Sequence, residues 1–146
     1  MDEKTMLRLA RYQVDIVKFV KDQFKVDPDA WQVEALEACM NNKQMALKAC
    51  KGPGKTCVLS WIAWWFLATR PHPKIAATSI SWDNLADGLW SEMSKWQQRS
   101  DFLKDQFEWT KTRIFNKDAP ETWFMSARSW SKSASDDQQA NTLAGL

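Results

Sequence analysis

Glycine, histidine and cysteine are scarce in this sequence, and their scarcity excludes several classes of site. The chain has 146 residues, with four glycines, three cysteines and a single histidine, His72. The cysteines are odd in number and form no C-x-x-C pair, so we expect no disulfide framework, and a reducing compartment fits best. Because His72 stands alone between two prolines, neither a zinc cluster nor a Ser-His-Asp set can be assembled around it.

A long apolar run is also missing. The most apolar stretch, "CVLSWIAWWFLA" at 57–68, has about 12 residues, whereas a membrane-spanning helix needs roughly 20. The N-terminus, "MDEKTMLRLARYQ", is charged and lacks the apolar centre of a signal peptide. We therefore expect residues 57–68 to form a buried helix, and we expect no association with a membrane.

The charge balance is nearly even. A net charge of +2 does not by itself indicate nucleic-acid binding, because that depends on clustered lysine and arginine. With 45% hydrophobic residues, the composition and length predict one globular domain with a real core. The ten tryptophans predict tight packing in the core or at an interface.

Hydrophobic spacing predicts two helices in the first third of the chain. Residues 2–24 have apolar side chains three and four apart, which indicates one amphipathic helix; these are Tyr12, Ile16, Phe19, Val20 and Phe24. A second helix follows in "KVDPDAWQVEALEACMNN", with Asp27 as its N-cap and Pro28 as its first residue. Asn41 and Asn42 are expected to end it.

Two further helices and two buried strands are expected in the middle of the chain. Residues 43–50 and 74–81 have the length and apolar character of strands, although periodicity alone does not distinguish 43–50 from a helix. Residues 55–69 predict an apolar helix that stops at "RPHP", because proline cannot continue it. Ser81 is expected to cap the helix that follows.

Two short runs near the C-terminus, "TRIF" and "TWFMSA", resemble strands joined by a polar turn. The whole order is therefore strand, glycine-containing loop, helix, strand, helix. This alternation predicts an α/β fold with a parallel sheet flanked by helices.

The stretch "ACKGPGKT" at 49–56 carries the clearest chemical motif. It matches G-x-x-x-x-G-K-[ST] at its last three positions, with Ala49 in place of the first glycine. A phosphate loop needs glycine freedom and the N-terminus of a helix, and the context predicts both. It also needs a lysine for the β/γ-phosphates and a hydroxyl for Mg²⁺, and Lys55 and Thr56 supply these. The alternative is a Gly-Pro-Gly turn beside a solvated lysine.

Two residues outside the core of the motif strengthen the nucleotide interpretation. Gln32 offers a donor and an acceptor that match the edge of adenine, although a lone glutamine on a helix is usually a surface residue. Lys51 adds a second positive charge near the γ-phosphate; otherwise it is a solvated lysine.

Several segments together resemble the N-terminal ATPase region of the large terminase subunit of tailed bacteriophages. They are "DPDAWQVEALEA", "ACKGPGKT", "KIAATSISWDNLADGLWSEMSKW" and "WFMSARSWSKSASDDQQANTLAGL". The resemblance runs from about residue 26 to the C-terminus. It implies residues 26–146 as the N-terminal part of a P-loop ATPase domain of the ASCE type; residues 1–25, the N-terminal amphipathic helix expected from the spacing, precede it.

This resemblance implies an ATP-driven motor that packages viral double-stranded DNA into a procapsid. It makes Gln32 the adenine reader, Lys55 the catalytic phosphate lysine and Thr56 the Mg²⁺ ligand. Lys51 takes a place often held by an arginine that acts on the γ-phosphate, and it keeps the charge without the fork. The expected binding residues for ATP and Mg²⁺ are Gln32, Ala49, Cys50, Lys51, Gly52, Pro53, Gly54, Lys55 and Thr56.

The same resemblance implies partners and a location. The partners are double-stranded DNA without sequence specificity, the small terminase subunit and the portal protein, with self-association an additional expectation. The location is the cytoplasm of the infected bacterial host.

The family's acidic Walker B strand would follow Leu146. We therefore expect an incomplete sheet in which 43–50 and 74–79 have unpaired edges, and little ATP hydrolysis by this chain alone. Asp136 and Asp137, in a serine-rich stretch, are weak candidates for a metal role. The alternatives are a helicase-type P-loop ATPase fragment and a non-catalytic module that binds DNA or protein.

Overall fold

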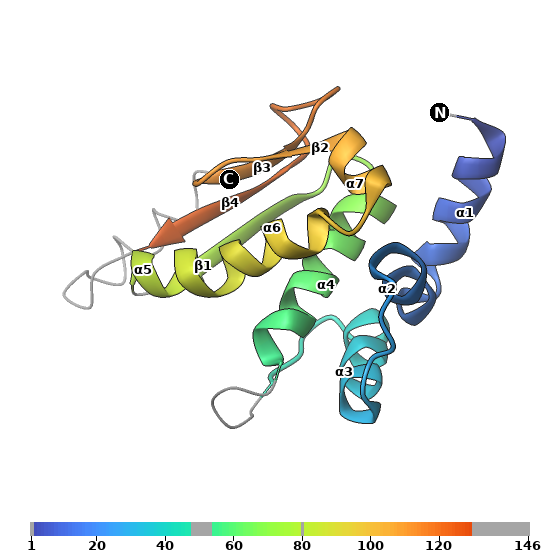
Figure 1. Cartoon of the computed structure of the whole chain (residues 1–146), viewed down its shortest axis with the longest axis horizontal. Helices are drawn as coiled ribbons and strands as arrows, with labels where there is room; N and C mark the ends of the chain where they lie inside the picture. The colour runs from blue at the N-terminus through green and yellow to red at the C-terminus, as the bar shows by residue number, and fades with distance from the viewer. Residues whose placement is uncertain (1, 48–53, 80, 130–146) are drawn as a thin grey trace.

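The computed structural model describes residues 2–47, 54–79 and 81–129. It is a mixed α/β structure in which helix α4 (Lys55–Thr69) contacts α1, α2 and α3 on the N-terminal side and α6 on the other (Figure 1). The remaining elements are α1 (Glu3–Gln13), α2 (Ile16–Phe24), α3 (Ala30–Asn41), β1 (Lys74–Ser79), α5 (Trp82–Leu85), η1 (Ala86–Trp90), α6 (Ser91–Gln97), α7 (Asp101–Gln106), β2 (Phe107–Trp109), β3 (Arg113–Asn116) and β4 (Phe124–Ser129).

The first expected helix is two helices. The chain leaves the helical conformation at Val14, and the Asp15 carboxylate accepts a hydrogen bond from the Lys18 backbone N–H at 3.0 Å, so Asp15 caps a new helix. The prediction of one helix over 2–24 was wrong because this local cap competes with helix continuation. The predicted apolar face is confirmed, since all five of its residues are buried: Tyr12, Ile16, Phe19, Val20 and Phe24.

Helix α3 begins two residues later than expected. Asp29 is its N-cap, and Pro28 precedes the helix instead of starting it. Asp29 and Gln32 form a capping box, in which each side chain satisfies a backbone N–H of the other residue. This reciprocal pair outweighs the preference of proline for the first helical position. The expected end was right, because the helix stops at Asn41 with Asn42 as its C-cap.

Helix α4 is the centre of the core, and its expected span of 55–69 is confirmed. Trp61, Trp64 and Trp65 are almost completely buried. The indole N–H of Trp64 donates to the Met93 carbonyl at 2.9 Å, and that of Trp65 donates to the Tyr12 carbonyl at 2.7 Å. These bonds pair the buried indole N–H groups of Trp64 and Trp65 and connect α4 to both sides of the molecule, whereas the buried indole nitrogen of Trp61 has no hydrogen-bond partner among the described residues.

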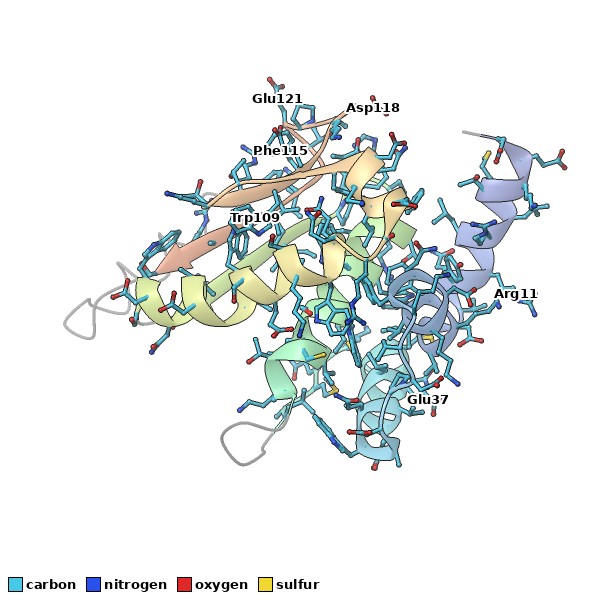
Figure 2. The ribbon with its side chains drawn as sticks, viewed as in Figure 1. Arg11, Glu37, Trp109, Phe115, Asp118 and Glu121 are labelled. Atoms are coloured by element: carbon cyan, nitrogen blue, oxygen red, sulfur yellow. The ribbon has the colours of Figure 1, made fainter. Side chains whose placement is uncertain are left out.

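The sheet is mixed, not parallel as predicted. Its strand order is β1-β4-β3-β2, with β1 parallel to β4 and the other neighbours antiparallel. A short turn joins β2 to β3, and residues 117–123, in which Figure 2 labels Asp118 and Glu121, join β3 to β4. Both connections bring the next strand back antiparallel. The helices from α5 to α7 separate β1 from these strands, and such a crossover permits a parallel pair. Among the described residues β1 pairs only with β4, so no described strand lies along its other edge.

The strand expected at 43–50 is not seen in its described part. Residues 43–47 are irregular, and residues 48–50 lie outside the described residues. Leu47 is half-buried and packs against the core.

The segment after β1 contains a π-helical turn that the spacing did not predict. Ser81 caps α5 as expected, since its hydroxyl accepts from the Asn84 N–H at 3.3 Å. The π turn, η1, then inserts between α5 and α6. The Ser91 hydroxyl donates to the carbonyls of Asp87 and Gly88, at 2.7 and 3.0 Å, and so satisfies oxygens near this irregularity.

Candidate functional site

The candidate site lies where α4 begins. Gly54 is the N-cap of α4 and has a φ of +76°, in the left-handed region that favours glycine. A Cβ at this position would lie 3.0 Å from the Gln32 amide nitrogen and 3.7 Å from the Trp31 ring. The glycine is therefore required both by its backbone conformation and by the close approach of α3.

The first turn of α4 offers backbone donors to an anion. It contains no acidic residue, and no side chain caps it among the described residues. Lys55 and Thr56 are the first two helical residues, and both side chains are half-exposed. Free N–H groups and the positive end of the helix dipole favour a phosphate at such a terminus, and Lys55 adds a full charge beside them.

Gln32 reaches this site from α3, about 20 residues away in sequence. Its side chain is 8% exposed, and its amide oxygen accepts a hydrogen bond from the Asp29 N–H at 2.9 Å. The sequence predicted that the oxygen and the nitrogen would together read adenine. The oxygen is instead engaged in the capping box, so only the amide nitrogen faces the loop end at Gly54.

The structure thus brings Gln32, Gly54, Lys55 and Thr56 to the region between the start of α3 and the start of α4. The other predicted site residues lie outside the described residues, so their roles stay predictions. They are Ala49, Cys50, Lys51, Gly52 and Pro53. Asp136 and Asp137 also lie outside the described residues.

Cys57, in the same first turn, is not a reactive thiol. Burial, reinforced by the negative charge of Glu92, raises its pKa from the ordinary 9.0 to about 12. The Glu92 carboxylate accepts a hydrogen bond from the Trp96 indole at 2.7 Å and is held in place by it. Since the nucleophilic form of cysteine is the thiolate, Cys57 remains a protonated packing residue at neutral pH.

His72 packs against the segment that precedes β4. It has a φ of 52°, its Nδ1 lies 2.8 Å from the Thr122 hydroxyl, and its ring packs against Trp123. Across 2–47, 54–79 and 81–129, no group of three His, Cys, Asp or Glu side chains could hold a metal ion.

An apolar groove of about 440 Å³ runs between α4 and the open edge of the sheet at β1. Leu59, Ile62 and Phe66 line it from α4, and Ile75 lines it from β1. Leu59 is 40% exposed, which is unusual for a leucine on so buried a helix. Sequence reasoning missed this groove, although the three- and four-residue spacing of these α4 side chains marks one face of a helix.

In the parts of the chain that the structure describes, no helix is long and apolar enough to cross a bilayer. No protein-family model matches the sequence, and no curated protein is similar enough to count as a relative. Function must therefore be argued from the residues themselves.

Proposed function

We propose that this chain is the ATP-binding part of the motor that packages viral double-stranded DNA into a procapsid, as in the large terminase subunit of a tailed bacteriophage. On this proposal the fold is a P-loop ATPase domain of the ASCE type. The chain works in the cytoplasm of the infected bacterium, with DNA, the small terminase subunit and the portal protein as partners, and it self-associates.

The observation that carries the proposal is the contact between Gln32 and Gly54. Two parts of one sequence pattern, separated by about 20 residues, meet at the N-terminus of α4. The capping box accounts for the position of the Gln32 amide oxygen but gives no role to the amide nitrogen, which lies near Gly54. A nucleotide site would give this nitrogen a role as a hydrogen-bond donor to the ligand.

The residues present fit Mg²⁺-ATP. The uncapped first turn of α4 and Lys55 would hold the phosphates, the Thr56 hydroxyl would ligate Mg²⁺, and the Gln32 amide would contact the base. When bound, Mg²⁺-ATP supplies the phosphoanhydride bond and the charge neutralisation that hydrolysis needs. The protein's own contribution is to bind, orient and screen the phosphates.

The open edge of β1 and the adjacent apolar groove are consistent with this proposal. A further strand placed along β1 would pair its free N–H and C=O groups and cover the groove. The family resemblance implies such a strand, which would bring the acidic residues that activate water. We therefore expect this chain to bind ATP but to hydrolyse it poorly.

The test is an ATP titration of the wild type, of Lys55→Ala and of Lys111→Ala, with Mg²⁺ present. Lys111 is an exposed lysine between β2 and β3 and serves as the matched control. We expect a Kd on the order of micromolar to millimolar, lost in Lys55→Ala and retained in Lys111→Ala. Equal affinity in wild type and Lys55→Ala would overturn the proposal.

A further inference from the structure

A second hollow lies on the N-terminal side of the molecule, away from the start of α4. It has a volume of about 490 Å³ and lies between α1, the end of α2 and the corner that joins α6 to α7. Arg8, Lys25 and Arg99 line it from these three places. None of the nucleotide-site residues lines it, so it is a separate site.

The cationic side chains of this hollow outnumber its carboxylates, since Arg8, Lys25 and Arg99 line it together with Asp22 and Asp101. Asp22 pairs with Lys18 at 3.2 Å, and Asp101 pairs with Lys104 at 3.2 Å. Lys18 and Lys104 do not line the hollow. Within the described residues, no carboxylate lies within ion-pair distance of Arg8, Lys25 or Arg99, so three cations face a space with no anion assigned to them.

The floor of the hollow is fixed by a chain of hydrogen bonds. The Ser100 hydroxyl donates to the Gln23 amide oxygen at 2.7 Å, and the Gln23 amide nitrogen donates to the Tyr12 hydroxyl at 3.3 Å. The Tyr12 hydroxyl donates to the Asp22 carboxylate at 3.0 Å. Ser100 and Tyr12 are each only 2% exposed. The hollow is therefore held open by buried groups from α1, α2 and the α6–α7 corner.

Two of the cations are also constrained. Arg99 donates to the Phe24 carbonyl at 3.4 Å and lies over the Trp96 ring at 4.8 Å, which orients its guanidinium. Lys25 ends α2 with a φ of 55°, a left-handed conformation that glycine or asparagine adopts with less strain. The positive charge of Lys25 suits the C-terminal end of α2 and also lies at the rim of the hollow.

The pKa shifts of Tyr12 and Asp22 agree with this arrangement. Burial raises the pKa of Tyr12, so the phenol stays neutral and its hydroxyl remains a hydrogen-bond donor. The positive charge of Arg8 has a weak lowering effect on this pKa. Burial tends to raise the pKa of Asp22. Hydrogen bonds from Lys18 and Tyr12 and the positive charge of Lys25 outweigh this effect, so the pKa lies below its usual range. The Asp22 carboxylate is thus already stabilised by its own partners.

We propose that this hollow binds a phosphate group through Arg8, Lys25 and Arg99. A phosphate carries up to two negative charges and several acceptor oxygens, which suit two arginine forks and one ammonium. The hollow is much larger than one phosphate, so the group is carried either by a small phosphorylated molecule or by a nucleic-acid backbone. The proposal is independent of the nucleotide site at α4.

The experiment is a titration of the full ¹⁵N-labelled chain, followed by the backbone amide signals of Gln23, Lys25 and Ser100. The probes are inorganic phosphate, pyrophosphate and a short DNA duplex, each at low and moderate salt. We expect these three signals to shift during the titration. The signals of Gly54, Lys55 and Thr56 report the nucleotide site in the same spectra, so failure at one site is distinguishable from failure at the other.

The decisive variant is Arg8→Gln with Lys25→Asn. Neither side chain has a hydrogen-bonding partner among the described residues, and asparagine tolerates the left-handed conformation. The control is Lys4→Gln with Lys111→Gln, which removes the same charge from exposed positions elsewhere. Losing two partly exposed cations should weaken phosphate binding by about tenfold, and the control should leave it unchanged.

The three probes distinguish a small phosphorylated ligand from a nucleic-acid backbone as the carrier of the phosphate group. Shifts at these signals with inorganic phosphate or pyrophosphate indicate a small phosphorylated ligand. Shifts with the duplex alone, weakened by salt, indicate a nucleic-acid backbone, and both results support the proposal. No shift with any probe, or equal affinity in the Arg8→Gln/Lys25→Asn variant and the wild type, overturns it.

Discussion

The two ends of α4 differ sharply, although they belong to one continuous helix. From Val58 onward most of the helix is buried, and the indoles of Trp64 and Trp65 donate to backbone carbonyls of other elements. Its first turn is half-exposed, lacks a side-chain cap and begins at a glycine with positive φ. The buried part holds the molecule together, and the first turn is left able to bind a ligand. Substitutions at the two ends should therefore affect different properties.

The largest expected effect comes from Trp64 at the buried end. Trp64→Ala removes a completely buried ring and should lower the free energy of unfolding by about 3–5 kcal/mol. Trp64→Phe should cost less, since only part of the ring and the bond to the Met93 carbonyl are lost. Urea denaturation measures both. Trp82, which is 37% exposed, is the control, and an equal loss in Trp82→Ala would show that burial does not set the cost.

Gly54→Ala tests the junction between the two ends. The positive φ should cost about 1–2 kcal/mol, and the new Cβ would meet the Gln32 amide at 3.0 Å. ATP binding should fall together with stability. Gly88→Ala is the matched control, because nothing lies within 4 Å of its Cβ position, and it should stabilise the chain by about 0.4–1 kcal/mol. Thermal unfolding of the two variants should move in opposite directions; a neutral Gly54→Ala would contradict the argument.

Gln32→Glu separates the capping role from base recognition. Glutamate still accepts the Asp29 N–H and completes the capping box, but it lacks the amide donor that faces the loop end. Stability should change little, whereas ATP affinity should fall about tenfold, or roughly 1.4 kcal/mol.

The preference for ATP over GTP should also narrow in Gln32→Glu, which a general charge effect on phosphates would not cause. Competition binding with both nucleotides measures it. An unchanged preference would show that Gln32 acts only as part of the cap.

The last expected effect, which is absent at neutral pH, is a dependence of stability on alkaline pH. The folded-state pKa of Cys57, about 12, lies above the ordinary 9.0, so the folded chain holds this proton more tightly than the unfolded chain. The corresponding stability is present below pH 9 and is lost as the pH rises toward 12. Cys57→Ala should flatten this part of the curve in denaturation at several pH values. An unchanged slope would mean that the thiol is not desolvated in the folded state.

Local sequence signals predicted the helices better than the sheet. The span of α4 was predictable because a glycine precedes it and prolines follow it, and the buried face of α1 and α2 followed from residue spacing. The break at Val14 was missed because Asp15 competes as a cap within a continuous apolar pattern. β2 was missed because "FEW" is too short to show alternation, and it is a strand only because it pairs with β3.

The candidate nucleotide site was partly predictable. Lys55 and Thr56 were found from the motif, and their place at a helix start is confirmed. Gln32 was chosen for the chemistry of its amide, but its use as half of a capping box depends on where α3 begins, which the sequence pattern placed two residues too early.

The sequence by itself determined which residues are apolar, the span of α4, and that Gly54, Lys55 and Thr56 stand at its start, because these depend on neighbours within a few residues. Only the tertiary structure decided the mixed strand pairing, the contact of Gln32 with Gly54, and the meeting of Arg8, Lys25 and Arg99 around one hollow. Those features join residues far apart in the chain, and their positions depend on how the tryptophan-rich core packs around α4.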